Sequence, residues 1–505
     1  MNKISQKTNY HKSNLHRDPL AVLDVISSLE VGPVHLERNR MTMPYKVVHG
    51  HKADSINLVY KFEEDVFKPD ESSSINLAEI IGAQVALNYG LFCKKIIFNG
   101  TFDKHDRRFI VDMAENTARE IYVKKFLEPN PFLIGQAAHV PALKRKSYLR
   151  SKIIFKMDKS KAENIHWNTN QLKYAVLSSG GKDSLLSFGL LNEMGFDTHP
   201  IYINESGRHW FTALNAYRHF RQNYPNTARV WTNADRVFNW MLHQLPFVRQ
   251  DFARFRADEY PIRLWTVAVF IFGALPLIRK RGIGRIIIGN EYDTTRKMNY
   301  MGIPHYDGLY DQSRYFDNAL TRYYRRKGWG LIQFSFIRPL AELSIQNILA
   351  KRYPQLQHHQ VSCHAAHIAN GRVLPCGDCE KCRRIVGMLM ALGANPTHCG
   401  YTRTQIARVL TQLSSAHLRQ DAASAEHLAF LLEKKRLIHP AGSERAAIRE
   451  HSQISKMMFD NEKSIGHEIP SYLKKKLFSI YLKYADGIVV HEHGIWVDRN
   501  IRRVQ

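Results

Sequence analysis

A short glycine-rich segment between an apolar run and a helical pattern constrains the fold of this chain more than any other feature. Residues 174–177 are apolar, as in a buried strand, and Ser179–Ser184 (SGGKDS) follow. Residues 185–194 have the pattern of a helix, which Gly195 ends. Further strand-like runs at 198–203 and 285–289 alternate with helical patterns. This alternation predicts an α/β domain with a parallel sheet.

The segment SGGKDS, called the glycine loop below, suits a nucleotide pyrophosphate. Gly180 and Gly181 carry no side chain, so backbone N–H groups can close on phosphate oxygens at the positive end of the new helix. Lys182 can neutralise a phosphate, and Asp183 can cap the helix or hold Mg²⁺ through water. We predict that ATP contacts Ser179, Gly180, Gly181, Lys182, Asp183 and Ser184, and that Lys182 and Asp183 are also catalytic.

The glycine loop differs from two common nucleotide-binding motifs. It lacks both the Walker A spacing and the G-x-G-x-x-G fingerprint. It matches the SGGxDS signature of the PP-loop ATP pyrophosphatases, so the chain resembles that superfamily. The resemblance implies a parallel sheet of the adenine nucleotide alpha hydrolase type, with ATP and Mg²⁺ over the carboxyl ends of the strands. It also implies that the strand after the loop helix ends near the adenosine, at Asn204.

Four cysteines have the spacing of a metal site. Cys363, Cys376, Cys379 and Cys382 follow the pattern C-x12-C-x2-C-x2-C, and four thiolates in such a pattern can close a tetrahedral Zn²⁺ site. The favoured interpretation is a structural zinc knuckle. An iron–sulfur cluster, or unrelated buried thiols, are the alternatives.

Two PP-loop families combine such a loop with a late cysteine cluster. The chain resembles 7-cyano-7-deazaguanine synthase over residues 172–390, and UDP-MurNAc-L-Ala-L-Glu epimerase over a longer span, 55–395. The longer resemblance runs through Gly289-Asn290-Glu291 and 335–343, and implies nucleotide contacts at Asn290 and Glu291. We therefore expect an enzyme most like the epimerase, with a nitrogen-adding synthase or a tRNA-modifying enzyme as alternatives.

Both resemblances imply one chemistry, in which a substrate carboxylate attacks the α-phosphate of ATP and pyrophosphate leaves. Glu291, Asp293, His305 and Glu342 are candidate polar groups, each of which is alone more typical of a structural residue. Arg338 is predicted to be catalytic as an anion contact, since a guanidinium suits a carboxylate or phosphate. A structural ion pair between Arg338 and Glu342 is the alternative.

Composition sets the broad class. The chain has 505 residues and 72 Lys and Arg against 46 Asp and Glu, a formal charge of +26. Such a charge attracts anions, so we expect an anionic small-molecule substrate besides ATP. The basic segments 144–161, 434–436 and 474–476 leave tRNA as a further partner. The N-terminus has no apolar signal segment and no run is long enough to span a membrane, which predicts a cytoplasmic protein.

The pattern along the chain predicts five regions. A basic, poorly ordered arm covers 1–45, a small α+β domain covers 46–165, and the PP-loop domain covers 170–345. The zinc knuckle with its helix covers 346–402, and a mostly helical extension covers 403–505, with helices at 404–413, 422–437 and 472–484 and a hairpin around 491–496. The apolar run 265–278 is predicted to be a buried core helix.

Overall fold

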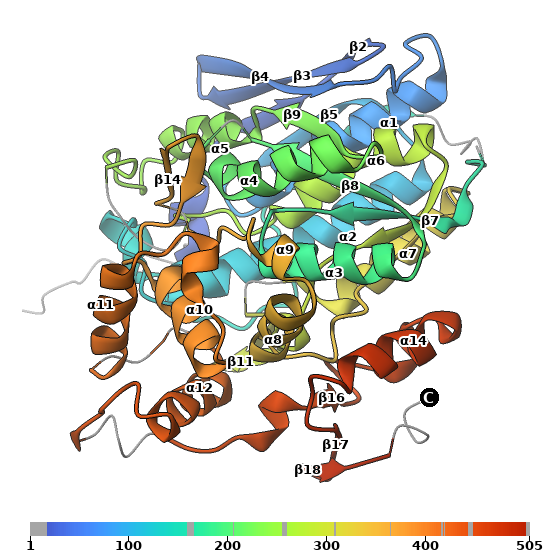
Figure 1. Cartoon of the computed structure of the whole chain (residues 1–505). Helices are drawn as coiled ribbons and strands as arrows, with labels where there is room; N and C mark the ends of the chain where they lie inside the picture. The colour runs from blue at the N-terminus through green and yellow to red at the C-terminus, as the bar shows by residue number, and fades with distance from the viewer. Residues whose placement is uncertain are drawn as a thin grey trace, which may run out of the picture.

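A computed structural model describes residues 18–158 and 166–500, apart from 206, 255–259, 308–309, 364, 416–417, 419 and 443–447. Positions 1–17 of the predicted arm, and the end of the basic segment at 159–161, lie outside the described residues. The fold is mixed α/β around a mostly parallel central sheet (Figure 1).

One sheet of eleven strands runs through the described part of the molecule. Five parallel strands form one half, in the order β13 (Ile332–Phe334), β10 (Ile283–Ile287), β7 (Asn170–Leu177), β8 (Asp197–Asn204) and β9 (Ala228–Thr232). The other half continues through β4 (Lys52–Phe62), β3 (Arg40–His49), β1 (Ser28–Val31), β5 (Lys95–Phe102) and β6 (Lys152–Asp158), while β2 (His35–Glu37) pairs with β3.

The predicted poorly ordered arm is wrong for residues 18–45. These residues form a 3₁₀ turn, η1 (Pro19–Leu23), and then β1, β2 and the start of β3. Side chains alternate along β3, with Met41, Met43 and Tyr45 buried. The basic segment stabilises the start of this region, because Arg145 and Arg150 both form ion pairs with Asp18. The pairing of β1 and β3 with strands distant in the sequence decides this structure, and such pairing leaves little trace in a local window of sequence.

The predicted small domain and the predicted PP-loop domain share the same sheet. Strand β4 pairs antiparallel with β9, which places Tyr60 opposite Thr232. The helical elements of the first part are α1 (Ser72–Ala83), η2 (Gln84–Tyr89), α2 (Lys104–Ile121), η3 (Tyr122–Leu127) and η4 (Gly135–His139). The alternating apolar and polar residues 55–62 lie in β4, the short apolar run 95–98 lies in β5, and the amphipathic stretch 110–126 lies in α2 and η3.

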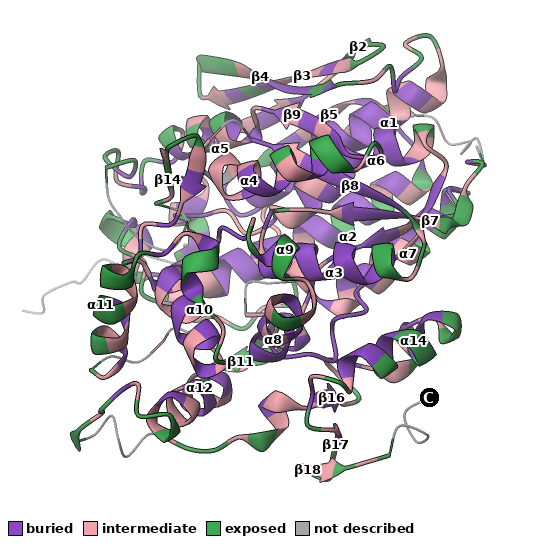
Figure 2. Ribbon diagram, in the orientation of Figure 1, coloured by how far each residue is buried: buried purple, intermediate pink, exposed green. Residues whose placement is uncertain are grey.

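Helices cover both faces of the parallel half. They are α3 (Lys182–Glu193), α4 (Arg208–Asn223), α5 (Ala234–His243), α6 (Val267–Lys280), α7 (Arg314–Arg326) and α8 (Glu342–Arg352). Tyr174 and Val176 of β7 join the hydrophobic cluster that contains α3 and α4, whereas Ala175 joins the cluster that contains α6. The strands are consequently buried on both sides (Figure 2). Helix α6 is the buried core helix that the sequence predicts.

Shorter elements follow the sheet. They are η5 (Tyr292–Thr294), β11 (Met298–Tyr300), β12 (Ile303–His305), η6 (Tyr310–Gln312), α9 (Pro354–Gln357), β14 (His367–Ala369), β15 (Arg372–Leu374), α10 (Glu380–Ala391) and η7 (Pro396–Cys399). Among the described helices, none combines the length and the apolar character that crossing a bilayer requires.

The C-terminal extension lies beside α8 and α10, far from the β2–β4 end of the sheet (Figure 1). It contains α11 (Arg403–Leu413), α12 (Ala422–Lys434), η8 (Ser452–Ser455), β16 (Met457–Phe459), η9 (Gly466–Glu468), α14 (Ser471–Tyr481), β17 (Ile488–Glu492) and β18 (Ile495–Asp498). The hairpin predicted around 491–496 is confirmed as β17–β18. The extension is not only helical, since β16 joins that hairpin in a small sheet.

Candidate active site

The glycine loop joins β7 to α3 at the carboxyl edge of the parallel strands. Gly180 has φ +74°, and a Cβ at this position would lie 2.6 Å from the carbonyl oxygen of Thr212 in α4. Only glycine fits both this backbone conformation and this close approach. Gly181 is the N-cap of α3, so the loop leads straight into a helix N-terminus.

The end of β10 packs directly against the loop. A Cβ on Gly289 would lie 2.7 Å from the Cβ of Asp183, so the backbone of β10 passes against the start of α3. This approach places Asn290 and Glu291, which follow Gly289, beside the loop. Predicted residues from two distant parts of the sequence are thereby brought together.

Lys182 is the centre of a buried charge cluster. Its side chain is 7% exposed, and Nζ lies 2.9 Å from Asp183 Oδ1, 3.2 Å from Glu291 Oε2 and 3.3 Å from Glu342 Oε1. Glu342 stands in the first turn of α8, and its other oxygen accepts a hydrogen bond from Gln420 and lies 3.5 Å from Arg384 Nη1. We call Lys182, Asp183, Glu291 and Glu342 the Lys182 cluster.

Burial and charge compete in the Lys182 cluster. Burial acts to lower the pKa of Lys182, but the charges of Asp183, Glu291 and Glu342 outweigh it and raise the pKa. Burial raises the pKa of Glu291 to about 8, with repulsion from Asp183 and Glu342 adding to the effect. Burial also acts to raise the pKa of Glu342, yet Lys182 and Arg384 lower it overall. Three carboxyl groups therefore share one buried ammonium ion, and Glu291 keeps its proton to a higher pH than a free glutamate does.

Two predicted asparagines lie at strand ends next to the loop. Asn204 is the last residue of β8, and Asn290 follows β10. Asn290 is 3% exposed, and its Nδ2 has no hydrogen-bond partner among the described residues. A buried amide donor without a partner is costly, so it marks a place where a ligand can bind.

Arg338 lies outside the Lys182 cluster. Its Nη2 donates to Asp317 at 2.5 Å, and its Nη1 donates to Thr294 and Thr295 at 3.1 and 3.0 Å. The alternative of an ion pair with Glu342 is wrong, because Glu342 pairs with Lys182 and Arg384 instead. The guanidinium is committed to protein groups and holds the segment after Glu291 in place, which argues for a positioning role rather than the predicted substrate contact.

His305 also lies elsewhere. His305 is buried near Glu128 and Asp307. One ring nitrogen of His305 and one carboxylate oxygen from each acidic residue lie within 4.8 Å of one another. Lys124 forms ion pairs with both carboxylates. The sequence offered no signal for this grouping.

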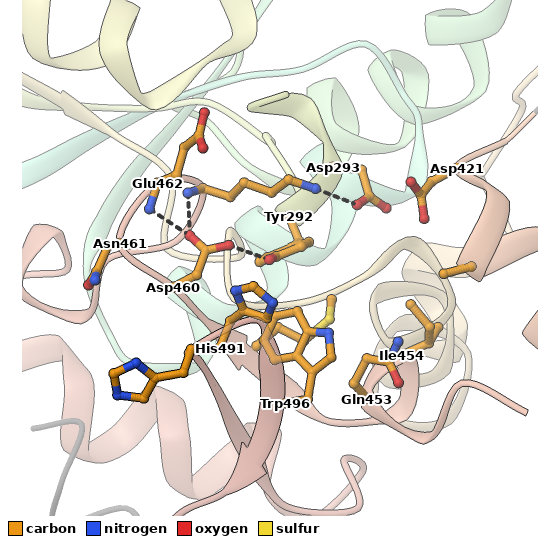
Figure 3. A pocket seen from close by; sticks show the side chains of 14 residues that line it. Tyr292, Asp293, Asp421, Gln453, Ile454, Asp460, Asn461, Glu462, His491 and Trp496 are labelled. Carbon is orange, nitrogen blue, oxygen red and sulfur yellow. Dashed lines mark hydrogen bonds and ion pairs between the residues drawn. The ribbon is translucent and has the colours of Figure 1, made fainter. Parts of the chain in front are cut away.

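The C-terminal extension contacts Asp293, two residues after Glu291 of the Lys182 cluster. Ser424 of α12 lies 3.5 Å from Asp293, and Lys463 lies 3.8 Å from it. These contacts border a pocket of about 570 Å³, in which the side chains of Asp293 and Asp421 lie close to each other and His491 lies over Trp496 (Figure 3). Burial and repulsion from Asp421 raise the pKa of Asp293 to about 6. The sequence carries no signal that the extension contributes to this pocket.

The four predicted cysteines converge. Their sulfur atoms lie within 4.8 Å of one another, with Cys379 Sγ 3.5 Å from Cys382 Sγ and 3.7 Å from Cys363 Sγ. The edge of a tetrahedral zinc–sulfur site is about 3.8 Å, given Zn–S bonds of about 2.3 Å. The N–H groups of Asp378 and Cys379 donate to Cys376 Sγ, both at 3.4 Å. The residues present therefore fit a metal ion held by four thiolates.

The basic segments predicted for tRNA are partly used within the protein. Lys474 of α14 is 7% exposed, and the ion pairs of Arg145 and Arg150 with Asp18 are structural. Lys475 and Lys476 are exposed. Lys144, Lys146 and residues 434–436 are exposed too, so binding of tRNA by these segments stays a prediction.

Comparison with known proteins gives a local similarity. None of the protein-family models matches this chain. Over 64 residues the chain is 36% identical to 7-cyano-7-deazaguanine synthase of Chlorobium phaeobacteroides (strain DSM 266 / SMG 266 / 2430). It is 31% identical to the protein of the same name from Chlorobium luteolum (strain DSM 273 / BCRC 81028 / 2530), again over 64 residues. Each match spans 13% of this chain and only 28% of the relative. Part of the chain is thus similar to a synthase, and neither match is an epimerase.

Proposed function

We propose that this chain is an ATP pyrophosphatase of the PP-loop type that activates a substrate carboxylate by adenylylation. The carrying observation is the glycine loop, where Gly180 and Gly181 precede the N-terminus of α3 and Lys182 stands among three carboxyl groups. Backbone N–H groups and a helix N-terminus bind a pyrophosphate, and Lys182 supplies a positive charge for it. The local similarity to a synthase supports the same class.

In the proposed reaction a carboxylate oxygen of the substrate attacks the α-phosphorus of ATP. The bond between the α-phosphorus and the bridging oxygen breaks, and pyrophosphate leaves with that electron pair. The loop N–H groups and Lys182 stabilise the charge that develops on pyrophosphate. The products are an acyl adenylate and pyrophosphate.

The Lys182 cluster also fits Mg²⁺. Binding of ATP would draw the ammonium group of Lys182 toward the phosphates. The carboxylate oxygens of Asp183, Glu291 and Glu342 would then be free to bind a metal ion, and Mg²⁺ prefers oxygen ligands. When bound there, Mg²⁺ would neutralise phosphate charge. Lys182 thus keeps the carboxyl groups together before the nucleotide arrives.

For the second half-reaction we propose attack on the acyl adenylate by ammonia or an amine, which releases AMP and forms a carbon–nitrogen bond. Both matched relatives are synthases, so we rank this outcome above epimerisation of a UDP-muramoyl dipeptide. For the four cysteines we propose a structural Zn²⁺ ion.

The test is an ATP assay with Mg²⁺ that measures pyrophosphate and orthophosphate separately. Candidate acceptors are 7-carboxy-7-deazaguanine with ammonia, a UDP-muramoyl dipeptide, and tRNA. We expect pyrophosphate with one acceptor, and a loss of ~100-fold or more in Asp183→Ala, which removes a group beside the departing pyrophosphate.

The matched control is Asp112→Ala, because Asp112 is an exposed residue of α2 whose carboxylate pairs with Arg108 and not with the Lys182 cluster. Its rate should equal that of the wild type. Release of orthophosphate alone, or equal rates in the two aspartate variants, would refute adenylylation.

A further inference from the structure

A second group of buried polar atoms without partners lies at the carboxyl ends of β8 and β9. Glu205 directly follows β8, is 4% exposed, and its Oε1 has no hydrogen-bond partner among the described residues. Asp235, in the first turn of α5 after β9, has an unpartnered Oδ1. The Nε of Arg263 is likewise buried and unpartnered.

The charges of these three side chains act on one another, but the unpartnered atoms are not hydrogen-bonded to each other. Arg263 Nη1 lies 4.0 Å from Glu205 Oε1, which is too long for a hydrogen bond. The guanidinium is fixed in place between two rings, with its carbon 3.9 Å from the ring centroid of Tyr260 and 4.6 Å from that of Phe238. A donor and an acceptor therefore lie close together without a hydrogen bond between them, and this unbonded contact is called the gap below.

The charges around this gap restrict what can fill it. Burial raises the pKa of Glu205 to about 7, Arg263 lowers it, and Asp235 raises it. An anionic group would meet two carboxyl groups, and a cationic group would meet Arg263. A hydroxyl group is neutral and can both donate to Glu205 and accept from Arg263. The gap therefore suits the hydroxyl of a sugar.

The position in the fold points to the same ligand. Along the chain, β7 is followed by the glycine loop, α3, β8 and then the carboxylate of Glu205. Dinucleotide-binding folds use the same order, and their acidic residue after the second strand binds the ribose 2′-hydroxyl. Strands β7 and β8 are adjacent and parallel, and the N–H of Ser178 donates to the carbonyl of Ile201. Glu205 consequently lies at the same edge of the sheet as the glycine loop.

We propose that Glu205 accepts a hydrogen bond from a ribose hydroxyl of the bound nucleotide and that Arg263 donates to the same hydroxyl. This inference rests on the proposed function, because it assigns the sugar of the nucleotide that the glycine loop binds. The family resemblance implies that the adenosine lies near Asn204, one residue earlier, and the sequence gives no signal for Glu205.

The experiment measures binding rather than turnover. The dissociation constants of α,β-methylene-ATP and of its 2′,3′-dideoxy form are measured by calorimetry on the full chain. The proteins are the wild type, Glu205→Gln, Glu205→Ala and the control Glu37→Gln on exposed β2. Circular dichroism verifies that each variant is folded, and the glutamine variant preserves the shape of the side chain.

We expect Glu205→Ala to weaken binding of α,β-methylene-ATP ~10-fold to 100-fold, which is the usual cost of losing a hydrogen bond to a charged group. Glu205→Gln should weaken it less, and Glu37→Gln should not change it. The dideoxy analogue should bind the wild type more weakly than α,β-methylene-ATP does. Its affinity should fall little further in the Glu205 variants.

Equal losses for both analogues in the Glu205 variants, or no loss for either, would overturn the ribose contact and leave the proposed function standing. Failure of the wild type to bind either analogue would refute the nucleotide site and the ribose contact together.

Discussion

Burial raises the pKa of Glu291, whereas the positive charge of Lys182 lowers it. The carboxyl group lies 3.2 Å from the ammonium group, yet burial and the neighbouring carboxyl groups prevail and raise its pKa. Glu205 and Asp293 have raised pKa values for the same main reason. These buried carboxyl groups therefore keep their protons to a higher pH than free ones, and a cation bound beside them would favour their ionised form.

Glu291 makes stability depend on pH. Its carboxyl group titrates near 4.5 when unfolded and at about 8 when folded. The folded state holds the proton more tightly, so this contribution is complete below pH 4.5 and is lost as the pH rises to 8. The wild type should therefore lose stability relative to Glu291→Gln over this range, as measured by melting temperature at intervals of one pH unit. A constant difference between the two proteins would contradict the raised pKa, and Glu37→Gln should follow the wild type.

The sequence predicts single residues of the site better than their partners. The SGGKDS pattern identifies Lys182 and Asp183, because two glycines before a helix have a clear physical meaning. It does not indicate that Glu342 reaches Lys182 from the N-terminus of α8. Glu205 and Arg263 carry no sequence signal, since their importance lies in atoms that lack partners only after folding.

At the scale of elements, the glycine loop and α4 are packed so closely that the loop has one conformation. The carbonyl of Thr212 occupies the space beside Gly180, and Gly180 needs a left-handed backbone. Gly181 has φ −84° and would place a Cβ no closer than 3.4 Å to its neighbours. The fold therefore requires glycine at position 180, whereas position 181 has room for a Cβ atom.

Gly180→Ala should destabilise the protein by ~1–3 kcal/mol, because the new methyl group meets backbone atoms and the φ angle is strained. Gly181→Ala, the matched control, should change the free energy of unfolding by less than ~1 kcal/mol. Urea unfolding of both variants measures the difference. Equal losses in the two variants would mean that the contact with Thr212 does not limit the loop.

Element prediction succeeded where one periodicity dominates. Strand β7, helix α3 and helix α11 appear where the apolar pattern predicts them. The prediction failed at β1 to β3, whose pairing with distant strands decides their structure. Long-range pairing of this kind leaves little trace in a local window of sequence.

At the scale of the whole molecule, the described residues form three hydrophobic clusters, two on opposite faces of the parallel strands and one in the C-terminal third. Cys363 and Cys382 belong to the third cluster, together with side chains of α10, α11 and α12. A metal ion bound by the cysteines would therefore stabilise the segment 363–382 where α10 packs against the C-terminal extension.

The purified protein should contain one zinc ion per chain by mass spectrometry. Cys379→Ser should lose the ion and at least ~3 kcal/mol of stability, because metal binding and folding are coupled in sites of this type. Cys399→Ser is the control, since Cys399 is buried beside Gln357 and lies outside the four-cysteine group. Iron with sulfide in the wild type, or zinc retained in Cys379→Ser, would contradict a zinc site.

The pairing of β4 with β9 has a consequence for solubility. Strand β9 has β8 on one side and, from Tyr60 to Phe62, β4 on the other. Without β4, the parallel half of the sheet would end in an open row of N–H and C=O groups, which invites other chains to add to it. The N-terminal strands thus cover an edge that would otherwise promote aggregation, and a fragment that begins at residue 166 would expose that edge.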